Sequence, residues 1–343
     1  MRTREKILIA PLDWGLGHAT RCVPLIRQYL AEGNEVMIAT NGDSAAFLKQ
    51  QFPTVKVRED IPGYNIRYPK HGSMAWHMFL RSALIFKVIR EEHAWLDKVI
   101  DQEKITHVIS DNRYGLYSKK SRCTFITHQL FIQAPPFFQR ILKSFVKKFV
   151  SKFDECLVPD FEGKQNLSGK LSHGRLFLRN VRYIGPLSRF EKHTAKATHE
   201  DFDYEYFAVI SGIETQRTVF QQKITALLLA TGKPALITCG QPQQTTDKTQ
   251  KKVRIVSHMD DEALAKAIHR SRYIICRSGY STIQDLYALG KKAILVPTPG
   301  QTEQEYLAMH LCAEWDFRQI LQKDLGSATL KDETKDFDTE WKS

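Results

Sequence analysis

Two short turns that contain glycine, about 260 residues apart, constrain the fold of this chain more than any other feature. The first, Gly15–Arg21 (GLGHATR), follows the apolar run Lys6–Leu12 and precedes apolar residues at helical spacing. The second, Arg277–Thr282 (RSGYST), follows the apolar run Tyr273–Cys276 and also opens a helical pattern. Each turn therefore joins a buried strand to a helix, whose first N–H groups suit an anion such as a diphosphate.

Strand and helix patterns alternate along the chain, which predicts an α/β fold with two Rossmann-like, doubly wound parallel-sheet domains facing across a cleft. With 343 residues the chain is longer than one hydrophobic core usually serves. We expect an N-terminal domain over 1–187, a linker over 188–205, a C-terminal domain over 206–325, and a tail or closing helix over 326–343. The linker is predicted because Ser188–Glu205 is polar and lacks apolar periodicity.

The expected strands are short apolar runs, and long amphipathic segments such as Met74–Gln102 are expected helices. In the first half the expected strands are Lys6–Leu12, Glu35–Thr40, Val55–Arg58, His107–Ser110, Thr124–Thr127, Glu155–Val158 and Val181–Ile184. In the second half they are Tyr206–Ile210, Ala235–Thr238, Val253–Ser257, Tyr273–Cys276 and Ala293–Val296.

The charge of the chain narrows the class of partner. The 50 Lys and Arg residues against 38 Asp and Glu residues give a formal net charge of +12, which suits nucleic acid, an anionic membrane or a phosphorylated substrate. No nucleic-acid motif accompanies this charge, so no nucleic-acid partner is predicted. The N-terminus begins a strand instead of a signal peptide, and no stretch approaches the roughly 18 apolar residues of a membrane span. A cytoplasmic protein is expected.

The cysteines and the paired acids give no sign of a metal site. The six cysteines form no CxxC pair and are expected to be reduced. The Asp-x-Asp pairs at 201–203 and 336–338 lie in the predicted linker and tail, away from any strand end. No metal and no cofactor are predicted.

One segment, Phe137–Phe153, is strongly basic and amphipathic. Its cations are Arg140, Lys143, Lys147, Lys148 and Lys152, and it contains no acid. On a helix the apolar residues fall on the opposite face, which is how a helix lying on anionic lipid is built. The alternative is a crossover helix whose apolar face packs on the sheet, because a predicted strand follows it. Both interpretations can hold together, and they allow a location on the inner face of the plasma membrane.

His18 is the candidate catalytic base. Gly15 and Gly17 let another molecule approach the backbone beside it, and an imidazole at a helix start is held neutral and fit to accept a proton. The alternative is that His18 only caps the helix. Asp111 and His128, each just past a predicted strand, are candidates for the acceptor side, with core or turn roles equally open.

The second turn and the loop that follows it combine several donor-binding features. Ser281 and Thr282 can hold a diphosphate, and Asp285, one turn further along the helix, can accept both hydroxyls of a ribose. Gln304 and Glu305, in the loop after the next strand, can hold a sugar by paired hydrogen bonds. Their order over about thirty residues favours a nucleotide-sugar site.

In this order the residues resemble a known family. The segment 277–306 is similar to the donor half of GT-B glycosyltransferases of the bacterial family that converts lipid I to lipid II (family 28). The family's Arg-x-Gly-x-x-Thr turn, acid and Gln-Gln-Tyr-like triplet correspond to Arg277, Gly279, Thr282, Asp285, Gln304, Glu305 and Tyr306. Asp replaces the family's Glu, and Glu305 replaces its second Gln. The resemblance implies an inverting, metal-independent sugar transfer, with His18 near the acceptor hydroxyl.

The resemblance also implies further donor contacts. Arg189 matches an arginine that reaches the diphosphate, and Gly212 and Arg217 lie in the turn that opens the second domain. His258 and Met259 would border the base. The complete expected donor site is Arg189, Gly212, Arg217, His258, Met259, Arg277, Ser278, Gly279, Tyr280, Ser281, Thr282, Asp285, Gln304 and Glu305.

The expected function is therefore transfer of a sugar, N-acetylglucosamine or another hexose, from a UDP-linked donor to an acceptor hydroxyl that is lipid-linked in similar enzymes. One alternative is a UDP-sugar 2-epimerase of the same fold, which needs carboxylates in the cleft that the sequence does not supply convincingly. The other is a non-catalytic subunit that binds nucleotide sugar or docks on a membrane, against which the presence of His18 argues.

Overall fold

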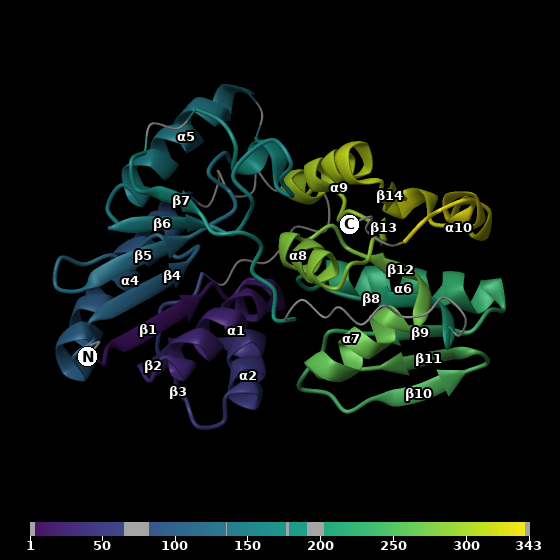
Figure 1. Cartoon of the computed structure of the whole chain (residues 1–343), viewed down its shortest axis with the longest axis horizontal. Coiled ribbons are helices and arrows are strands. Elements are labelled where there is room, and N and C mark those ends of the chain that lie inside the picture. Colours follow the sequence, from purple (N-terminus) through teal and green to yellow (C-terminus); the bar gives the residue numbers. More distant parts are fainter. Residues whose placement is uncertain (1–3, 65–81, 135, 176–177, 191–201, 340–343) are drawn as a thin grey trace. The chain divides into compact units, whose positions relative to one another are not determined.

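The computed structural model describes residues 4–64, 82–134, 136–175, 178–190 and 202–339. The described residues form two compact units, the first up to Leu187 and the second from Ser188 onward. Each unit is built on one seven-stranded sheet with helices packed beside it (Figure 1). Within the described ranges, every helix is too short or too polar to span a lipid bilayer.

The sheet of unit 1 is entirely parallel and has the strand order β3-β2-β1-β4-β5-β6-β7. Its strands are β1 (Lys6–Pro11), β2 (Glu35–Ala39), β3 (Lys56–Arg58), β4 (His107–Asp111), β5 (Arg122–Ile126), β6 (Glu155–Val158) and β7 (Val181–Tyr183). The strand order reverses between β1 and β4, where Pro11 pairs with Asp111. Ligands bind at the carboxyl ends of the strands beside such a reversal.

Helices cover both faces of this sheet (Figure 1). They are α1 (Leu16–Ala31), α2 (Gly42–Gln51), α4 (Ser82–Glu103) and α5 (Pro136–Val150), with a short 3₁₀ turn at Gly169–Leu171. Side chains alternate along β1, so Ile7 and Ile9 pack with α1 and α2, while Leu8 and Ala10 pack with α4 and α5. The apolar runs of the sequence are therefore strands buried on both faces.

The basic helix α5 is a crossover between β5 and β6. Val146 and Val150 belong to the hydrophobic core, and Phe145 packs against it. Phe149 is also buried, so much of the apolar face that the sequence offers to a membrane is used inside unit 1. Ile141 remains 56% exposed on the same helix.

The sheet of unit 2 has the order β10-β11-β9-β8-β12-β13-β14, and only β10 runs antiparallel to its neighbour. Its strands are β8 (Tyr204–Val209), β9 (Ala235–Thr238), β10 (Asp247–Gln250), β11 (Val253–Val256), β12 (Ser271–Cys276), β13 (Ile294–Leu295) and β14 (Arg318–Gln319). Its helices are α6 (Gln216–Thr231), α7 (Asp261–His269), α8 (Tyr280–Ala288), α9 (Thr302–Trp315) and α10 (Ser327–Thr334), with a 3₁₀ turn, η2, at Gln322–Asp324.

The predicted fold class, two Rossmann-like parallel-sheet domains, is confirmed. Several details differ from the sequence expectations. The strand β8 begins at Tyr204, inside the predicted linker, and β10 and β14 were not predicted. The predicted helix Met74–Gln102 is seen as α4 from Ser82, and its expected first part lies outside the described residues. In the C-terminal segment α10 forms, and Leu330 and Phe337 join the core of unit 2.

Candidate active site

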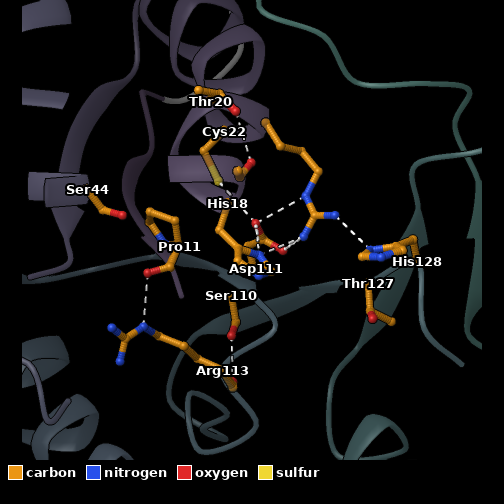
Figure 2. Close-up of polar contacts among 12 residues, drawn as sticks. Pro11, His18, Thr20, Cys22, Ser44, Ser110, Asp111, Arg113, Thr127 and His128 are labelled. Carbon is orange, nitrogen blue, oxygen red and sulfur yellow. Dashed lines mark hydrogen bonds and ion pairs between the residues drawn. The ribbon is translucent and has the colours of Figure 1, made fainter. Parts of the chain in front are cut away.

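The start of α1 places His18 beside the end of β4. Gly15 precedes this helix with a φ of 74°, a left-handed conformation that strains residues with a Cβ. Ser44 Oγ donates to the carbonyl oxygen of Gly15 over 3.1 Å. Thr20 Oγ1 donates to that of Gly17 over 3.0 Å (Figure 2). The two predicted glycines thus shape the turn, and His18 lies in the first turn of the helix.

His18 belongs to a polar cluster with Asp111, Arg21 and His128 (Figure 2). Nδ1 of His18 lies 3.1 Å from Oδ2 of Asp111, the last residue of β4. Arg21, three residues after His18, donates from Nε to Oδ2 over 3.2 Å and from Nη2 to Oδ1. Nη1 of Arg21 lies 2.9 Å from Nδ1 of His128, which follows β5. Three elements distant in sequence therefore meet at the carboxyl ends of adjacent strands.

Asp111 is a carboxylate at neutral pH although it is fully buried. Burial alone would raise the pKa of its carboxyl group. The charges and hydrogen bonds of Arg21 and His18 outweigh burial and lower this pKa to about 2. The cluster thus combines a buried negative charge with a guanidinium that pairs with both of its oxygens.

The proton on His18 determines what the cluster can do. Nδ1 of His18 lies 3.1 Å from Asp111 and 2.9 Å from Nη2 of Arg21. A carboxylate only accepts and a guanidinium only donates, so this nitrogen bonds to one of them at a time. When Nδ1 carries the proton it donates to Asp111, and Nε2 is left with a lone pair. In that tautomer the imidazole can take a proton from a hydroxyl group.

In unit 2, Arg277 supports the turn after β12 from inside. Its side chain is 1% exposed, and its guanidinium lies 3.9 Å from the centroid of the Phe220 ring. Nη1 donates to the carbonyl oxygens of Val296 and Pro297 over 3.0 and 3.1 Å. Burial lowers the pKa of Arg277 to about 9. The sequence suggests that this side chain binds the sugar donor. In the structure its guanidinium forms hydrogen bonds to backbone carbonyl groups of the same unit.

The start of α8 has the residue types and backbone of an anion site. Gly279 is the N-cap residue and no side chain caps the helix. A Cβ added to Gly279 would meet no atom within 4 Å. Tyr280, Ser281 and Thr282 form the first turn, where N–H groups and the helix dipole favour negative charge.

The predicted sugar-binding residues Gln304 and Glu305 shape the loop before α9. Oε1 of Gln304 accepts from the N–H of Thr298, and Oε1 of Glu305 accepts from that of Gly300, each over 2.9 Å. The buried Ser278 donates from Oγ to the carbonyl oxygen of Gln304 over 2.8 Å. The structure places Gln304 and Glu305 in the first turn of α9 and not in the loop, and this first turn is in direct contact with the turn at the start of α8.

Arg189 joins several of the predicted donor-binding residues. Asp285 accepts a hydrogen bond from Ser188 Oγ over 2.6 Å, and its Oδ2 lies 3.3 Å from Nε of Arg189. Nη1 of Arg189 donates to Oδ1 of Asp261 over 3.1 Å. Burial raises the pKa of Asp285, against the effects of Arg189 and Ser188. Burial and the charge of Arg189 lower the pKa of His258.

The remaining predicted donor residues lie at other strand ends of unit 2. Gly212, with a φ of 113°, lies in the turn after β8. Arg217, in the first turn of α6, donates from Nη1 to the carbonyl oxygen of Gly240 over 3.0 Å and from Nη2 to Glu214 over 2.7 Å. Met259 is half-buried next to His258. In the described part of the chain, no group of three or more His, Cys, Asp or Glu side chains is arranged to hold a metal ion.

Comparison with known proteins supports a glycosyltransferase. Residues 207–342 match the glycosyltransferase family 28 C-terminal domain. An uncharacterized glycosyltransferase of Methanosarcina acetivorans is 26% identical over 334 residues, with 88% of this chain and 81% of the relative covered. A shorter match of 109 residues, 31% of this chain and 28% of the relative, is 36% identical. That relative is the UDP-N-acetylglucosamine–N-acetylmuramyl-(pentapeptide) pyrophosphoryl-undecaprenol N-acetylglucosamine transferase of Finegoldia magna.

Solved structures with the same fold span almost the whole chain. The glycosyltransferase SnogD from Streptomyces nogalater has a TM-score of 0.62 at 14% identity, with 97% of this chain and 92% of that chain covered. MurG from Acinetobacter baumannii has a TM-score of 0.55 at 12% identity, with 96% and 89% covered. This chain is a glycosyltransferase with the GT-B fold. The segment that matches the family 28 C-terminal domain contains the turn and loop at 277–306.

Two residues in the clusters of this glycosyltransferase were not assigned a role from the sequence, Arg21 and Asp261. Arg21 is three residues after His18, a spacing that puts both side chains on one face of a helix. Asp261 is the first residue of α7, three residues after His258. The spacing could have suggested both residues, but their partners Asp111 and Arg189 depend on the folded topology.

Proposed function

We propose that this glycosyltransferase moves a sugar, N-acetylglucosamine or another hexose, from a UDP-linked donor to an acceptor hydroxyl group. The reaction inverts the anomeric carbon and needs no metal ion. The contact between His18 and Asp111 carries this proposal. A histidine whose Nδ1–H donates to a buried carboxylate has Nε2 available for a proton and a counter-charge for the imidazolium that forms.

In the proposed reaction, Nε2 of His18 takes the proton of the acceptor hydroxyl as its oxygen attacks the anomeric carbon. The new carbon–oxygen bond forms opposite the bond to the diphosphate, which breaks, and UDP leaves with the electron pair. Asp111 stabilises the imidazolium. In unit 2, the N–H groups at the start of α8 meet the charge of the leaving diphosphate, and Asp285 accepts hydrogen bonds from the ribose.

The donor assignment is supported by the family 28 domain and by the name of the Finegoldia magna relative. We expect UDP to raise the melting temperature of the protein in the presence of EDTA, because backbone N–H groups and arginines neutralise the diphosphate. At 100 times its dissociation constant a ligand adds about 2.7 kcal/mol to the free energy of unfolding. Thermal shift with a series of nucleotides measures this effect.

Two variants of unit 2 test whether Asp285 contributes to UDP binding. Asp285→Asn should lose much of the UDP shift, since asparagine has one acceptor oxygen for the two ribose hydroxyls and no negative charge. Asp324→Asn is the matched control, because Asp324 is an exposed acid in η2 of the same unit. A UDP shift that appears only after Mg²⁺ is added would contradict the metal-independent assignment.

We also propose that the acceptor is lipid-linked and that unit 1 binds an anionic membrane surface. Support comes from the pyrophosphoryl-undecaprenol in the name of the Finegoldia magna relative. A groove of about 340 Å³ between α4 and α5 adds a physical argument, because its cations are Arg90, Lys148 and Lys152 and it contains no acid. Beside it, Phe86 is 47% exposed on α4, so positive charge and apolar side chains occur together.

This proposal predicts co-sedimentation with vesicles of phosphatidylcholine and phosphatidylglycerol that weakens as salt rises. Each surface cation contributes about 1 kcal/mol to such binding. Arg90→Glu combined with Lys148→Glu should therefore abolish it. Lys248→Glu combined with Lys251→Glu, two exposed cations of unit 2, is the control with the same change of charge. If both double variants bound vesicles equally, α5 would have no part in membrane binding and would be only a crossover helix.

A further inference from the structure

Arg21 lies at the centre of the cluster in unit 1 and contacts three side chains that can carry or lose a proton. Its Nε and Nη2 donate to the two oxygens of Asp111, and Nη2 also lies 2.9 Å from Nδ1 of His18. Its Nη1 lies 2.9 Å from Nδ1 of His128. Arg21 is 2% exposed, and Asp111 and His128 are buried with it, so water competes little for these bonds.

The contact with Arg21 fixes the proton of His128. The guanidinium of Arg21 pairs with the carboxylate of Asp111, and a guanidinium has donors but no acceptor. Nδ1 of His128 must therefore accept, which requires a lone pair on this nitrogen. The imidazole is then neutral, and its single proton is on Nε2. In this tautomer Nδ1 of His128 accepts from Arg21, and Nε2 can only donate.

Arg21 acts on His18 through Asp111. Its charge is the main influence that lowers the pKa of this buried carboxyl group against the effect of burial. Without Arg21, burial would favour a neutral Asp111, whose O–H would donate to Nδ1 of His18. The proton of His18 would then be on Nε2, and the imidazole would have no lone pair for an acceptor hydroxyl. An ionised Asp111 instead accepts from Nδ1–H and leaves Nε2 basic, and Nη2 of Arg21 then donates to Oδ1 of Asp111 and not to Nδ1 of His18.

We propose that Arg21 is a positioning residue that sets opposite tautomers in two histidines, with the proton of His18 on Nδ1 and that of His128 on Nε2. The proposal deepens the function proposed for His18, on which it rests. One guanidinium thereby gives the site a base and a neutral hydrogen-bond donor. Since both depend on the same buried side chain, a change at Arg21 should alter them together.

The tautomers can be observed directly by long-range ¹H–¹⁵N correlation spectra of the full chain labelled with ¹⁵N-histidine. The chain has 12 histidines, and the signals of interest are assigned by their loss in His18→Gln and His128→Gln. We expect the neutral Nδ1–H pattern for His18 and the neutral Nε2–H pattern for His128 at pH 7. An imidazolium or Nδ1–H pattern at His128, or an Nε2–H pattern at His18, would overturn the proposal.

Arg21→Met and Arg21→Lys separate the two effects. Methionine removes the charge, so His18 should shift toward the Nε2–H form and turnover should fall, with little change in the KM for the donor. Lysine keeps a positive charge beside Asp111 but lacks the second arm, so His18 should keep its tautomer while His128 loses its fixed form. Arg27→Met is the control, an exposed arginine on the same helix, and should leave both patterns unchanged.

The readouts distinguish this proposal from the proposed function. Tautomers are measured without turnover, so they remain informative if the protein transfers no sugar, and the wild-type spectrum tests the proposal even if Arg21→Met does not fold. Wild-type tautomers in folded Arg21→Met would refute the role of Arg21 while leaving His18 as a candidate base. A loss of melting temperature with unchanged tautomers would make Arg21 a purely structural residue.

Discussion

His18→Ala is expected to lower turnover by about 10²–10⁴-fold, the range that a positioned general base contributes. Alanine removes the nitrogen that takes the proton of the acceptor hydroxyl, and no other group replaces it in the proposed reaction. UDP affinity should remain close to that of the wild type, because the proposed donor contacts belong to unit 2. UDP release from UDP-N-acetylglucosamine measures the rate, and titration calorimetry measures the affinity.

Ser44→Ala is the matched control for this variant. Its hydroxyl donates to the carbonyl oxygen of Gly15 in the same turn, so alanine should cost about 1 kcal/mol of stability, the scale of one hydrogen bond. Turnover per folded molecule should not change, since Ser44 takes no part in the proposed chemistry. If His18→Ala were also less stable but turned over at the wild-type rate, His18 would be a helix-capping residue.

Asp111→Asn is expected to impair both turnover and stability. The asparagine amide can donate to Nδ1 of His18, which moves the histidine proton to Nε2 and removes the base. The guanidinium of Arg21 would stay buried without its counter-charge, and breaking a buried pair in this way costs about 3–5 kcal/mol. Urea unfolding measures this loss. Combining Asp111→Asn with His18→Ala should lower turnover little further than His18→Ala alone, because the two residues act as a unit.

The pH dependence of stability tests whether the negative charge of Asp111 stabilises the folded protein. The pKa of this carboxyl group is about 2 in the folded protein and 3.8 as its ordinary value. A lowered pKa stabilises the fold above the unfolded-state value, and this contribution is lost as pH falls through the folded-state value. The stability difference between the wild type and Asp111→Asn should therefore narrow between about pH 4 and pH 2. A difference that stays constant over this range would show that the charge of Asp111 does not contribute to the free energy of unfolding.

The sheets were predictable because parallel strands buried on both faces are short apolar runs. Ala235–Thr238 and Glu155–Val158 have the predicted bounds. The edge strand β10 (DKTQ) is polar and exposed along its whole length, so no apolar run marks it. Its pairing with β11 is set by backbone hydrogen bonds between neighbours, which a hydrophobic pattern does not record. Tertiary context determines such edges.

The sequence identifies individual candidate residues, but it does not give most of their contacts. His18, Asp111 and His128 each follow a predicted strand, yet only the strand order β1-β4-β5 brings them together. Arg277 shows the opposite limit, because a motif identifies the residue but does not give the direction of its side chain. Its guanidinium donates hydrogen bonds to the carbonyl oxygens of Val296 and Pro297.

The configuration of the sugar released from UDP-N-acetylglucosamine tests the proposed inverting, metal-independent reaction most directly. The wild-type protein should hydrolyse this α-linked donor slowly in EDTA, with water in place of the acceptor, and ¹H NMR follows the sugar as it appears. Inversion predicts that the β-anomer appears first and the α-anomer only later by mutarotation, and that His18→Ala releases neither at a comparable rate. Initial release of the α-anomer, formation of the 2-epimer, or a reaction that requires Mg²⁺ would contradict the proposed mechanism.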